Sequence, residues 1–189
     1  MRIQPTSSAI LDVAQTLCQT RGFNGFSYRD IASKLGIKSA SIHYHYPSKA
    51  QLGEALVVRY RGEFQAKLSK IRAEVSDPKK QIQRFTDAIG ALAKDNRKLC
   101  LCGMLAADSE SLSPGMREQV MGFFEDTDKW LEETFSAGKK SGSFSFGGSP
   151  KATAQGYIAA LQGMLMCARA FDDAARFDTA SNWLPTLLA

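Results

Sequence analysis

The chain has 189 residues, of which 44% are hydrophobic, so it can form one or two modest domains with buried cores. No run of about 18 apolar residues exists, which argues against a membrane span. The N-terminus lacks the apolar block of a signal peptide, and the four cysteines follow no regular framework. We therefore expect a cytoplasmic protein with reduced thiols.

The positive charge of the chain is concentrated in its first third. Residues 1–61 contain eight Lys and Arg against three Asp and Glu, a net charge of +5. The whole chain has 24 basic and 19 acidic residues, also a net charge of +5, so residues 62–189 are neutral overall. This distribution favours a polyanion-binding module at the N-terminal end.

Capping signals and hydrophobic spacing predict an all-α fold. Asp77-Pro78, Ser113-Pro114 and Ser149-Pro150 each place a capping residue before proline at the first helical position. No alternation of apolar and polar residues lasts long enough for a sheet, and Gly138–Ser149 reads as a flexible loop. The predicted helices cover residues 5–21, 27–35, 39–45, 48–74, 78–96, 100–110, 114–138, 150–172 and 176–188.

Residues 27–52 have the pattern of a DNA-reading helix-turn-helix. Ser27 and Asp30 form a capping-box-like start, and Gly36 tolerates the positive φ at which the first helix must stop. The second helix has Ile42 as its one strong apolar anchor, among small, hydroxylated and basic residues. Such a helix fits a major groove, where bases are recognised through hydrogen-bond donors and acceptors.

The motif and its surroundings resemble the N-terminal domain of the TetR family of transcriptional regulators. The residues that carry the resemblance are Ile10, Val13, Ala14, Leu17, Gly22-Phe23-Asn24-Gly25-Phe26, Ile31-Ala32, Gly36-Ile37 and Ser41-Ile42-His43-Tyr44-His45-Tyr46-Pro47-Ser48-Lys49. The family commonly has tyrosine at the position of His43. The resemblance covers roughly the first 60 residues and is loose afterwards.

The resemblance implies a homodimeric transcriptional repressor that binds a double-stranded operator through residues 1–50. Residues 51–189 would form a helical effector-binding and dimerisation domain, and the helix over 48–74 would connect the two. We expect Tyr44 and Lys49 to contact phosphates, and the charge of Lys49 would add to the N-terminal dipole of the helix that it opens. We expect Lys38, Ser39, Ser41 and His43 to lie near base edges. The full set of expected DNA-binding residues is Ser27, Tyr28, Lys38, Ser39, Ala40, Ser41, His43, Tyr44, His45 and Lys49.

The resemblance also implies an effector cavity in the C-terminal two-thirds, where large, soft side chains are frequent. The expected lining residues are Phe85, Ile89, Met104, Phe123, Trp130 and Met164. On residues 150–172, Gly156, Ala159 and Gly163 permit close helix approach, and the terminal helix adds Phe177, Trp183 and Leu184. The two helices are expected to form a two-fold interface, although the same residues would also suit packing within one subunit.

Cys100 and Cys102 are redox-sensing candidates. Lys94, Arg97 and Lys98 precede them, and both thiols fall near a predicted helix start, where thiolate is stabilised. The segment also resembles a TetR branch in which some members respond to electrophiles or oxidants. Cysteine is also among the residues most often buried in protein cores, and we expect that role for Cys18 and Cys167.

Three other classes of protein were weighed against a regulator. An enzyme is disfavoured because His43 and His45, the only histidines, both lie in the presumed recognition helix. A metal sensor is disfavoured because Cys100-x-Cys102 is too short for a zinc site, and we expect neither metal nor cofactor. A DNA-binding protein that works without metal or ligand remains the alternative.

Overall fold

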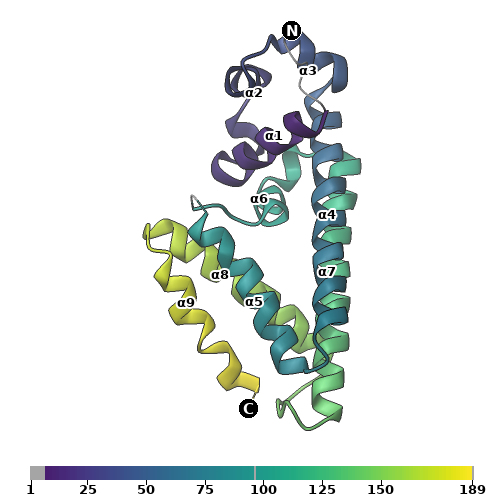
Figure 1. The fold of residues 1–189 in the computed structure, drawn as a ribbon, viewed down its shortest axis with the longest axis vertical. Coiled ribbons are helices and arrows are strands. Elements are labelled where there is room, and N and C mark those ends of the chain that lie inside the picture. Colours follow the sequence, from purple (N-terminus) through teal and green to yellow (C-terminus); the bar gives the residue numbers. More distant parts are fainter. Residues whose placement is uncertain (1–6, 96, 189) are drawn as a thin grey trace. The chain divides into compact units, whose positions relative to one another are not determined.

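The computed structural model describes residues 7–95 and 97–188, with only the backbone at positions 186 and 187. Within these ranges the protein is built from helices and loops, without strands, so the predicted all-α fold is confirmed (Figure 1). No helix in the described ranges is long and apolar enough to cross a membrane. The helices are α1 Ser7–Arg21, α2 Tyr28–Leu35, α3 Ser39–His45, α4 Lys49–Glu74, α5 Pro78–Lys94, α6 Leu101–Ala107, α7 Pro114–Lys140, α8 Pro150–Ala170 and α9 Ala175–Ser181, with short 3₁₀ helices at Phe23–Gly25, Ser109–Ser111 and Leu184–Leu188.

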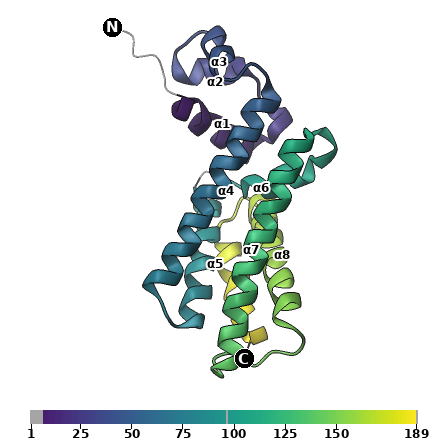
Figure 2. The same ribbon diagram turned by 90° about the vertical axis from the view of Figure 1, so that its right-hand side faces the viewer.

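The chain divides into two compact units. Unit 1 contains the residues up to Gly62 together with Leu101–Met121, and unit 2 contains Glu63–Cys100 and the residues from Gly122 onward. The long helices α4 and α7 therefore contribute to both units (Figure 2). The predicted domain boundary after residue 50 falls inside the first turn of α4 and stays a prediction.

The predicted helix starts are confirmed by their capping hydrogen bonds. The side chains of Asp77 and Ser149 accept from the backbone N–H groups of Lys79 and Ala152, at 2.9 and 3.1 Å. Ser113 Oγ accepts from the Met116 N–H at 3.2 Å. Each cap satisfies a donor that the first turn of a helix leaves unpaired, which explains why the three starts were readable in advance.

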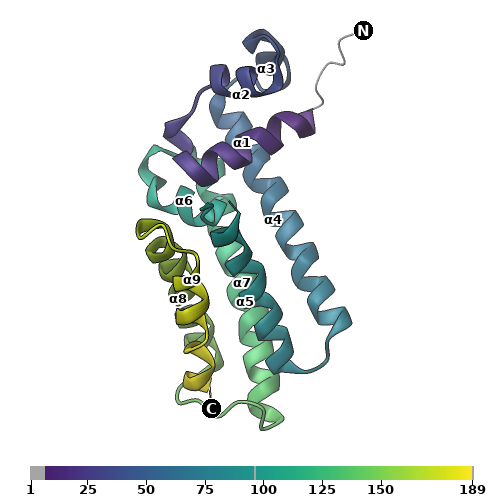
Figure 3. The same ribbon diagram turned by 60° about the vertical axis from the view of Figure 1, so that its left-hand side comes forward.

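Unit 1 packs α1, α2 and α3 around a small apolar core, and α6 contacts α1 (Figure 3). Ile10, Ile31 and Ile42 are fully buried in it. In unit 2, α8 contacts both α5 and α9, and α5 contacts α9 (Figure 1). The side chains of Phe85, Phe123 and Phe135 are buried there.

Four predicted helices end earlier than expected, two of them by three residues or more. The helix expected to end at residue 110 ends at Ala107, and a 3₁₀ turn follows over Ser109–Ser111. The helix expected over 176–188 is interrupted: α9 ends at Ser181, and Leu184–Leu188 is a 3₁₀ helix. Pro185 accounts for the second interruption, because proline lacks the N–H that a continuing α-helix would use.

The loop expected to be flexible is anchored by its aromatic residues. Helix α7 extends through Lys140, and Phe144 and Phe146 are both buried. Their rings contact that of Phe135, with centroids 5.6 and 5.8 Å away. The Gly/Ser composition of this segment predicted mobility, but it gave no indication that its two phenylalanines are buried.

Candidate functional site

The turn between α2 and α3 is fixed by local hydrogen bonds. Ser27 and Asp30 form the expected capping box, with the Ser27 N–H donating to Asp30 Oδ2 at 2.8 Å. Gly36 ends α2 with φ +65°, in the left-handed region that glycine favours. The Ile37 N–H then donates to the Ala32 carbonyl at 3.0 Å. The predicted helix-turn-helix is therefore formed as the sequence indicates.

Helix α3 exposes polar groups on the side away from its anchor. Ile42 is buried, while Lys38, Ala40, His43 and Tyr44 are exposed. Tyr44 is the most open of them, at 82% of its possible surface. Ser39, Ser41 and His45 are half-buried. These seven residues and the exposed Ser27 account for eight of the ten expected DNA contacts; of the other two, Lys49 is also half-buried and Tyr28 is buried.

Tyr28 and Lys49, the other two expected DNA contacts, are directed into unit 1. Tyr28 is buried, and its hydroxyl donates to the Tyr46 carbonyl at 2.8 Å. This burial, with the neighbouring Tyr46, raises the pKa of Tyr28 to about 12. The Lys49 ammonium donates to the Phe26 carbonyl at 2.6 Å and lies over the rings of Phe23 and Phe26. The structure therefore gives Lys49 a structural partner where a phosphate contact was expected.

Several polar residues that hold unit 1 together were missed by the sequence analysis. Arg59 of α4 is bonded to Asp12 at 2.7 Å and to Gln15 at 2.9 Å, both on α1. Ser113, at the start of α7, donates to Glu54 of α4 at 2.7 Å. These pairs are 47, 44 and 59 residues apart in sequence, so no local pattern could have identified them.

The aromatic residues of unit 2 form a continuous cluster. Trp130 stacks on Phe85 with ring centroids 5.6 Å apart, and Phe64 contacts both Phe85 and Phe123. Trp130 is only 7% exposed, yet its indole N–H has no hydrogen-bond partner within the described part of the chain. A buried donor left unpaired costs about 1–3 kcal/mol, so this N–H is a candidate ligand contact.

The six residues expected to line an effector cavity are not all brought together. Phe85, Phe123 and Trp130 share the aromatic cluster, and Ile89 is buried in the same unit. Met164 instead lines a groove between α8 and α9. Met104 belongs to unit 1, where its side chain approaches Gly22. A single cavity lined by all six remains a prediction.

Of the two thiols expected in the core, Cys18 is confirmed there and Cys167 is not. Cys18 is buried, and this burial, with the nearby Asp108 charge, raises its pKa to about 12, as suits a core residue. Cys100 and Cys102 are both 0% exposed. The expectation that Cys167 is a core residue was wrong, because it lies exposed on α8. No three His, Cys, Asp or Glu side chains in the described ranges are grouped so as to hold a metal ion.

The large apolar residues of α8 and of the C-terminal segment pack mostly within their own unit. Tyr157, Leu161 and Phe177 are buried there. Gly156, Ala159 and Gly163 are exposed, and a Cβ added at either glycine would meet no atom within 4 Å. The surface that remains for a partner therefore consists of small residues, with the exposed side chains of Met166 and Trp183 also open on these two segments.

An exposed recognition helix on a compact helix-turn-helix, joined to a helical second unit, defines a DNA-binding transcriptional regulator. Two family models match the chain: "Bacterial regulatory proteins, tetR family" over residues 10–56 and "Tetracyclin repressor-like, C-terminal domain" over residues 62–184. The chain belongs to the TetR family of bacterial transcriptional regulators.

Individual relatives agree with this assignment. A TetR transcriptional regulator from Legionella pneumophila is 34% identical, with all of both chains covered and a TM-score of 0.88. One from Agrobacterium tumefaciens is 32% identical, with 97% of each chain covered and a TM-score of 0.92. The HTH-type transcriptional repressor DhaR of Mycobacterium sp. (strain GP1) is 22% identical over 163 residues, which cover 86% of this chain and 81% of DhaR.

Proposed function

We propose that this regulator is a repressor that binds a pseudo-palindromic operator as a homodimer and releases it when an effector binds unit 2. The observation that carries the proposal is the outward face of α3, where Lys38, His43 and Tyr44 are exposed around the buried Ile42. Exposed donors and acceptors on a helix anchored by one apolar residue suit a major groove. DhaR, a relative over most of the chain, is itself named a repressor.

The contacts divide into two kinds. Ser39, Ser41 and His43 face base edges, with Lys38 at the N-terminal end of α3, and Tyr44 contacts phosphate. Ser27, Ala40 and His45 complete the interface at its border. Lys49 acts indirectly, because its hydrogen bond to the Phe26 carbonyl ties the start of α4 to the loop before α2.

The dimer forms through the small-residue face of α8 together with α9. Gly156, Ala159 and Gly163 are exposed, and the groove beside Gly163 continues along α9 through Arg176 and Thr179. Small residues let two helices approach closely, and a two-fold interface presents two copies of α3 to a symmetric operator.

The effector binds next to Trp130 and supplies a hydrogen-bond acceptor. The buried Trp130 N–H has no hydrogen-bond partner among the described residues, and the rings of Phe85 and Phe123 belong to the same cluster. A hydrophobic molecule with a carbonyl or ether oxygen would satisfy the indole N–H. Release follows by population shift, because the effector binds the released conformation better than the DNA-bound one.

Thiol modification is the second candidate trigger. Cys100 and Cys102 follow the basic segment Lys94–Lys98, but both are fully buried. An electrophile therefore reaches them only after the structure around the two thiols opens. Treatment with peroxide would then reduce operator affinity in the parent and leave it unchanged in Cys100→Ser.

Selection of protein-bound duplexes from a randomised library tests the repressor proposal. We expect enrichment of an inverted repeat, which then serves as the probe for a panel of hydrophobic ketones and esters. An active compound should lose most of its effect in Trp130→Phe, which keeps an aromatic ring but lacks the N–H. Operator binding that responds to no compound and no oxidant would instead identify a ligand-independent DNA-binding protein.

A further inference from the structure

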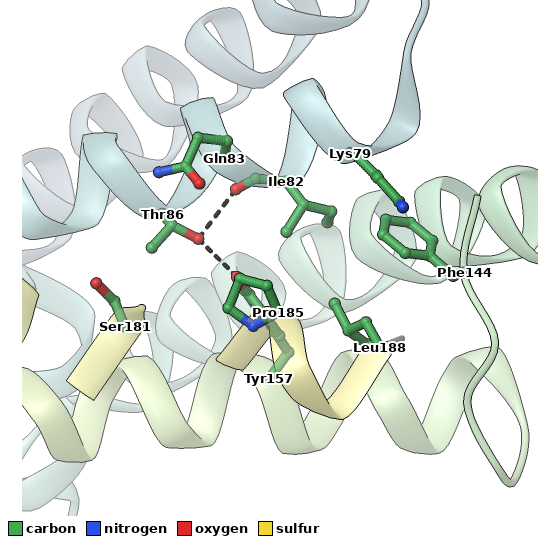
Figure 4. Close-up of a pocket in the computed structure, with 9 residues that line it drawn as sticks. All are labelled: Lys79, Ile82, Gln83, Thr86, Phe144, Tyr157, Ser181, Pro185 and Leu188. Carbon is green, nitrogen blue, oxygen red and sulfur yellow. Dashed lines mark hydrogen bonds between the residues drawn. The ribbon is translucent and has the colours of Figure 1, made fainter. Parts of the chain in front are cut away.

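Unit 2 contains a cavity that shares no lining residue with the Trp130 cluster. Its volume is about 180 Å³, and none of the six residues expected to line an effector cavity borders it. It is enclosed by α5, α8, α9, the loop before α8 and the C-terminal segment (Figure 4). The lining residues are Lys79, Ile82, Gln83, Thr86, Phe144, Tyr157, Ser181, Pro185 and Leu188.

One wall of the cavity is made by two segments that are far apart in sequence. The Ser145 N–H donates to the Leu188 carbonyl at 2.9 Å, which joins the loop before α8 to the C-terminal 3₁₀ helix. Phe144 is held against Phe135, and Lys139 donates to the Phe146 carbonyl at 3.3 Å. The wall therefore has defined anchors, and the cavity is a built feature of the fold.

The polar part of the cavity accepts hydrogen bonds. Thr86 Oγ1 donates its single hydrogen to the Ile82 carbonyl at 2.9 Å and lies 2.7 Å from the Tyr157 hydroxyl (Figure 4). The Tyr157 hydroxyl must therefore be the donor in the second bond. Both hydrogens are used, so a ligand at this pair must supply the donor of any hydrogen bond that it makes with either oxygen. The Gln83 amide nitrogen donates to Asp87 at 2.8 Å, and its amide oxygen has no hydrogen-bond partner among the described residues, so it can also accept from a ligand.

The other end of the cavity is cationic and apolar. Lys79 extends beside Phe144, away from Thr86 (Figure 4). Lys79 lies in the first turn of α5, so its ammonium and the positive end of the helix dipole both attract an anion. Ile82, Phe144 and Leu188 provide the apolar surface between the two ends.

We propose that this cavity binds a small monocyclic hydroxy acid, with its hydroxyl at Thr86 and Tyr157 and its carboxylate at Lys79. The volume sets the size, since a cavity of about 150 Å³ holds one benzene ring. The chemistry sets the two ends: a donor faces the Thr86–Tyr157 pair, and an anion faces the lysine. The proposal does not depend on how the protein binds DNA or on the Trp130 cluster.

Calorimetric titration with three probes tests the ligand class. 4-Hydroxybenzoate carries both groups, benzoate lacks the hydroxyl, and phenol lacks the carboxylate. We expect 4-hydroxybenzoate to bind about threefold to tenfold more tightly than benzoate, the effect of one net hydrogen bond. Equal affinities for the three probes, or no saturable binding of 4-hydroxybenzoate, would overturn the proposal.

Matched variants test the location. Lys79→Gln should weaken the binding of 4-hydroxybenzoate and of benzoate about threefold to fivefold, the effect of losing one exposed ion pair. The affinity for phenol should stay unchanged. Lys80→Gln, on the adjacent exposed lysine that does not line the cavity, should change none of the three affinities. Thr86→Val should reduce 4-hydroxybenzoate to the affinity of benzoate, and Thr86→Ser should restore the difference. Equal effects of the two lysine variants would place the carboxylate elsewhere and contradict the proposal.

Discussion

The Lys49 ammonium donates a 2.6 Å hydrogen bond to the carbonyl oxygen of Phe26, 23 residues earlier in the chain. It also lies 4.9 and 4.7 Å from the ring centroids of Phe23 and Phe26. Burial lowers the pKa of this ammonium because it disfavours the charged form, and the carbonyl and the two rings offset part of that cost. A lysine at the start of a helix beside a DNA-reading motif is thus part of the internal structure of unit 1.

Lys49→Met should destabilise the fold without changing the salt dependence of DNA binding. Methionine keeps an apolar chain but loses the charged hydrogen bond, so we expect the free energy of unfolding to fall by about 1–2 kcal/mol. Denaturant titration measures this loss. The slope of log affinity against log salt should stay as in the parent, and a decrease of about one would instead assign Lys49 to a phosphate.

Lys38→Met is the matched control for that experiment, because Lys38 is an exposed lysine in the same unit. Its loss should leave the free energy of unfolding within about 0.5 kcal/mol of the parent, as for most surface substitutions. Operator affinity should fall. If both lysine variants behaved alike in denaturant and in salt, the distinction between a structural and a DNA-facing lysine would be wrong.

His43→Ala and Tyr44→Phe should affect DNA binding in different ways. Loss of a base contact at His43 should relax the preference for one base pair, at a cost of about 1–3 kcal/mol on the parent operator. Loss of the Tyr44 hydroxyl should weaken binding by about 1 kcal/mol, roughly fivefold, on every sequence. Repeating the duplex selection with each variant separates the two effects. An unchanged preference in His43→Ala would move the base contact to another residue of α3.

Gly163→Leu should have opposite effects on a monomer and on a dimer. A Cβ added at this exposed helical glycine meets no atom of the described residues within 4 Å, and leucine favours helix over glycine by roughly 0.5–1 kcal/mol. A monomer should therefore become more stable, whereas a dimer that buries Gly163 should dissociate. Sedimentation at several concentrations measures the outcome.

Gly62→Leu provides the comparison, because Gly62 is also an exposed helical glycine with no atom within 4 Å of an added Cβ. It should leave the oligomeric state of the parent unchanged. A Gly163→Leu protein that sediments as the parent does would exclude this face of α8 from the interface.

One of the four thiols should react much faster than the others. Cys167 is exposed, whereas Cys18, Cys100 and Cys102 are buried. Cys167 lines the groove beside Gly163 that we propose as part of the dimer interface. In the dissociated chain a thiol reagent should therefore modify Cys167 rapidly, dimer formation should slow that phase, and Cys167→Ser should remove it. Rapid modification of Cys100 in the Cys167→Ser protein would show that its segment opens readily, which would strengthen its assignment as a redox sensor.

The elements that were predictable from sequence are those specified by neighbouring residues. The caps at Asp77, Ser113 and Ser149 and the turn at Gly36 each depend on atoms within a few positions, so local patterns identified them. The directions of Lys49 and Cys167 depend on which neighbours the fold supplies. Lys49 turns inward because Phe26 offers a carbonyl, and no spacing rule encodes that partner.

The same difference applies to the ligand sites. The aromatic content of the sequence indicated the cluster around Trp130, because large aromatic residues gather in one hydrophobic core even when they are far apart in sequence. The cavity beside Thr86 and Tyr157 was not predicted from the sequence. These two residues are 71 positions apart, and the cavity wall depends on the interruption of the C-terminal helix at Pro185.

Binding to two forms of the selected operator tests the central claim, that a symmetric dimer reads DNA through two copies of α3. The first duplex carries the inverted repeat as selected. The second carries about five additional base pairs between the half-sites, roughly half a helical turn, which places them on opposite faces of the DNA. Fluorescence anisotropy titration should show two chains bound per selected duplex, and affinity for the second duplex should fall to that for unrelated DNA. Equal affinity for the two duplexes, or one chain per selected duplex, would contradict the account.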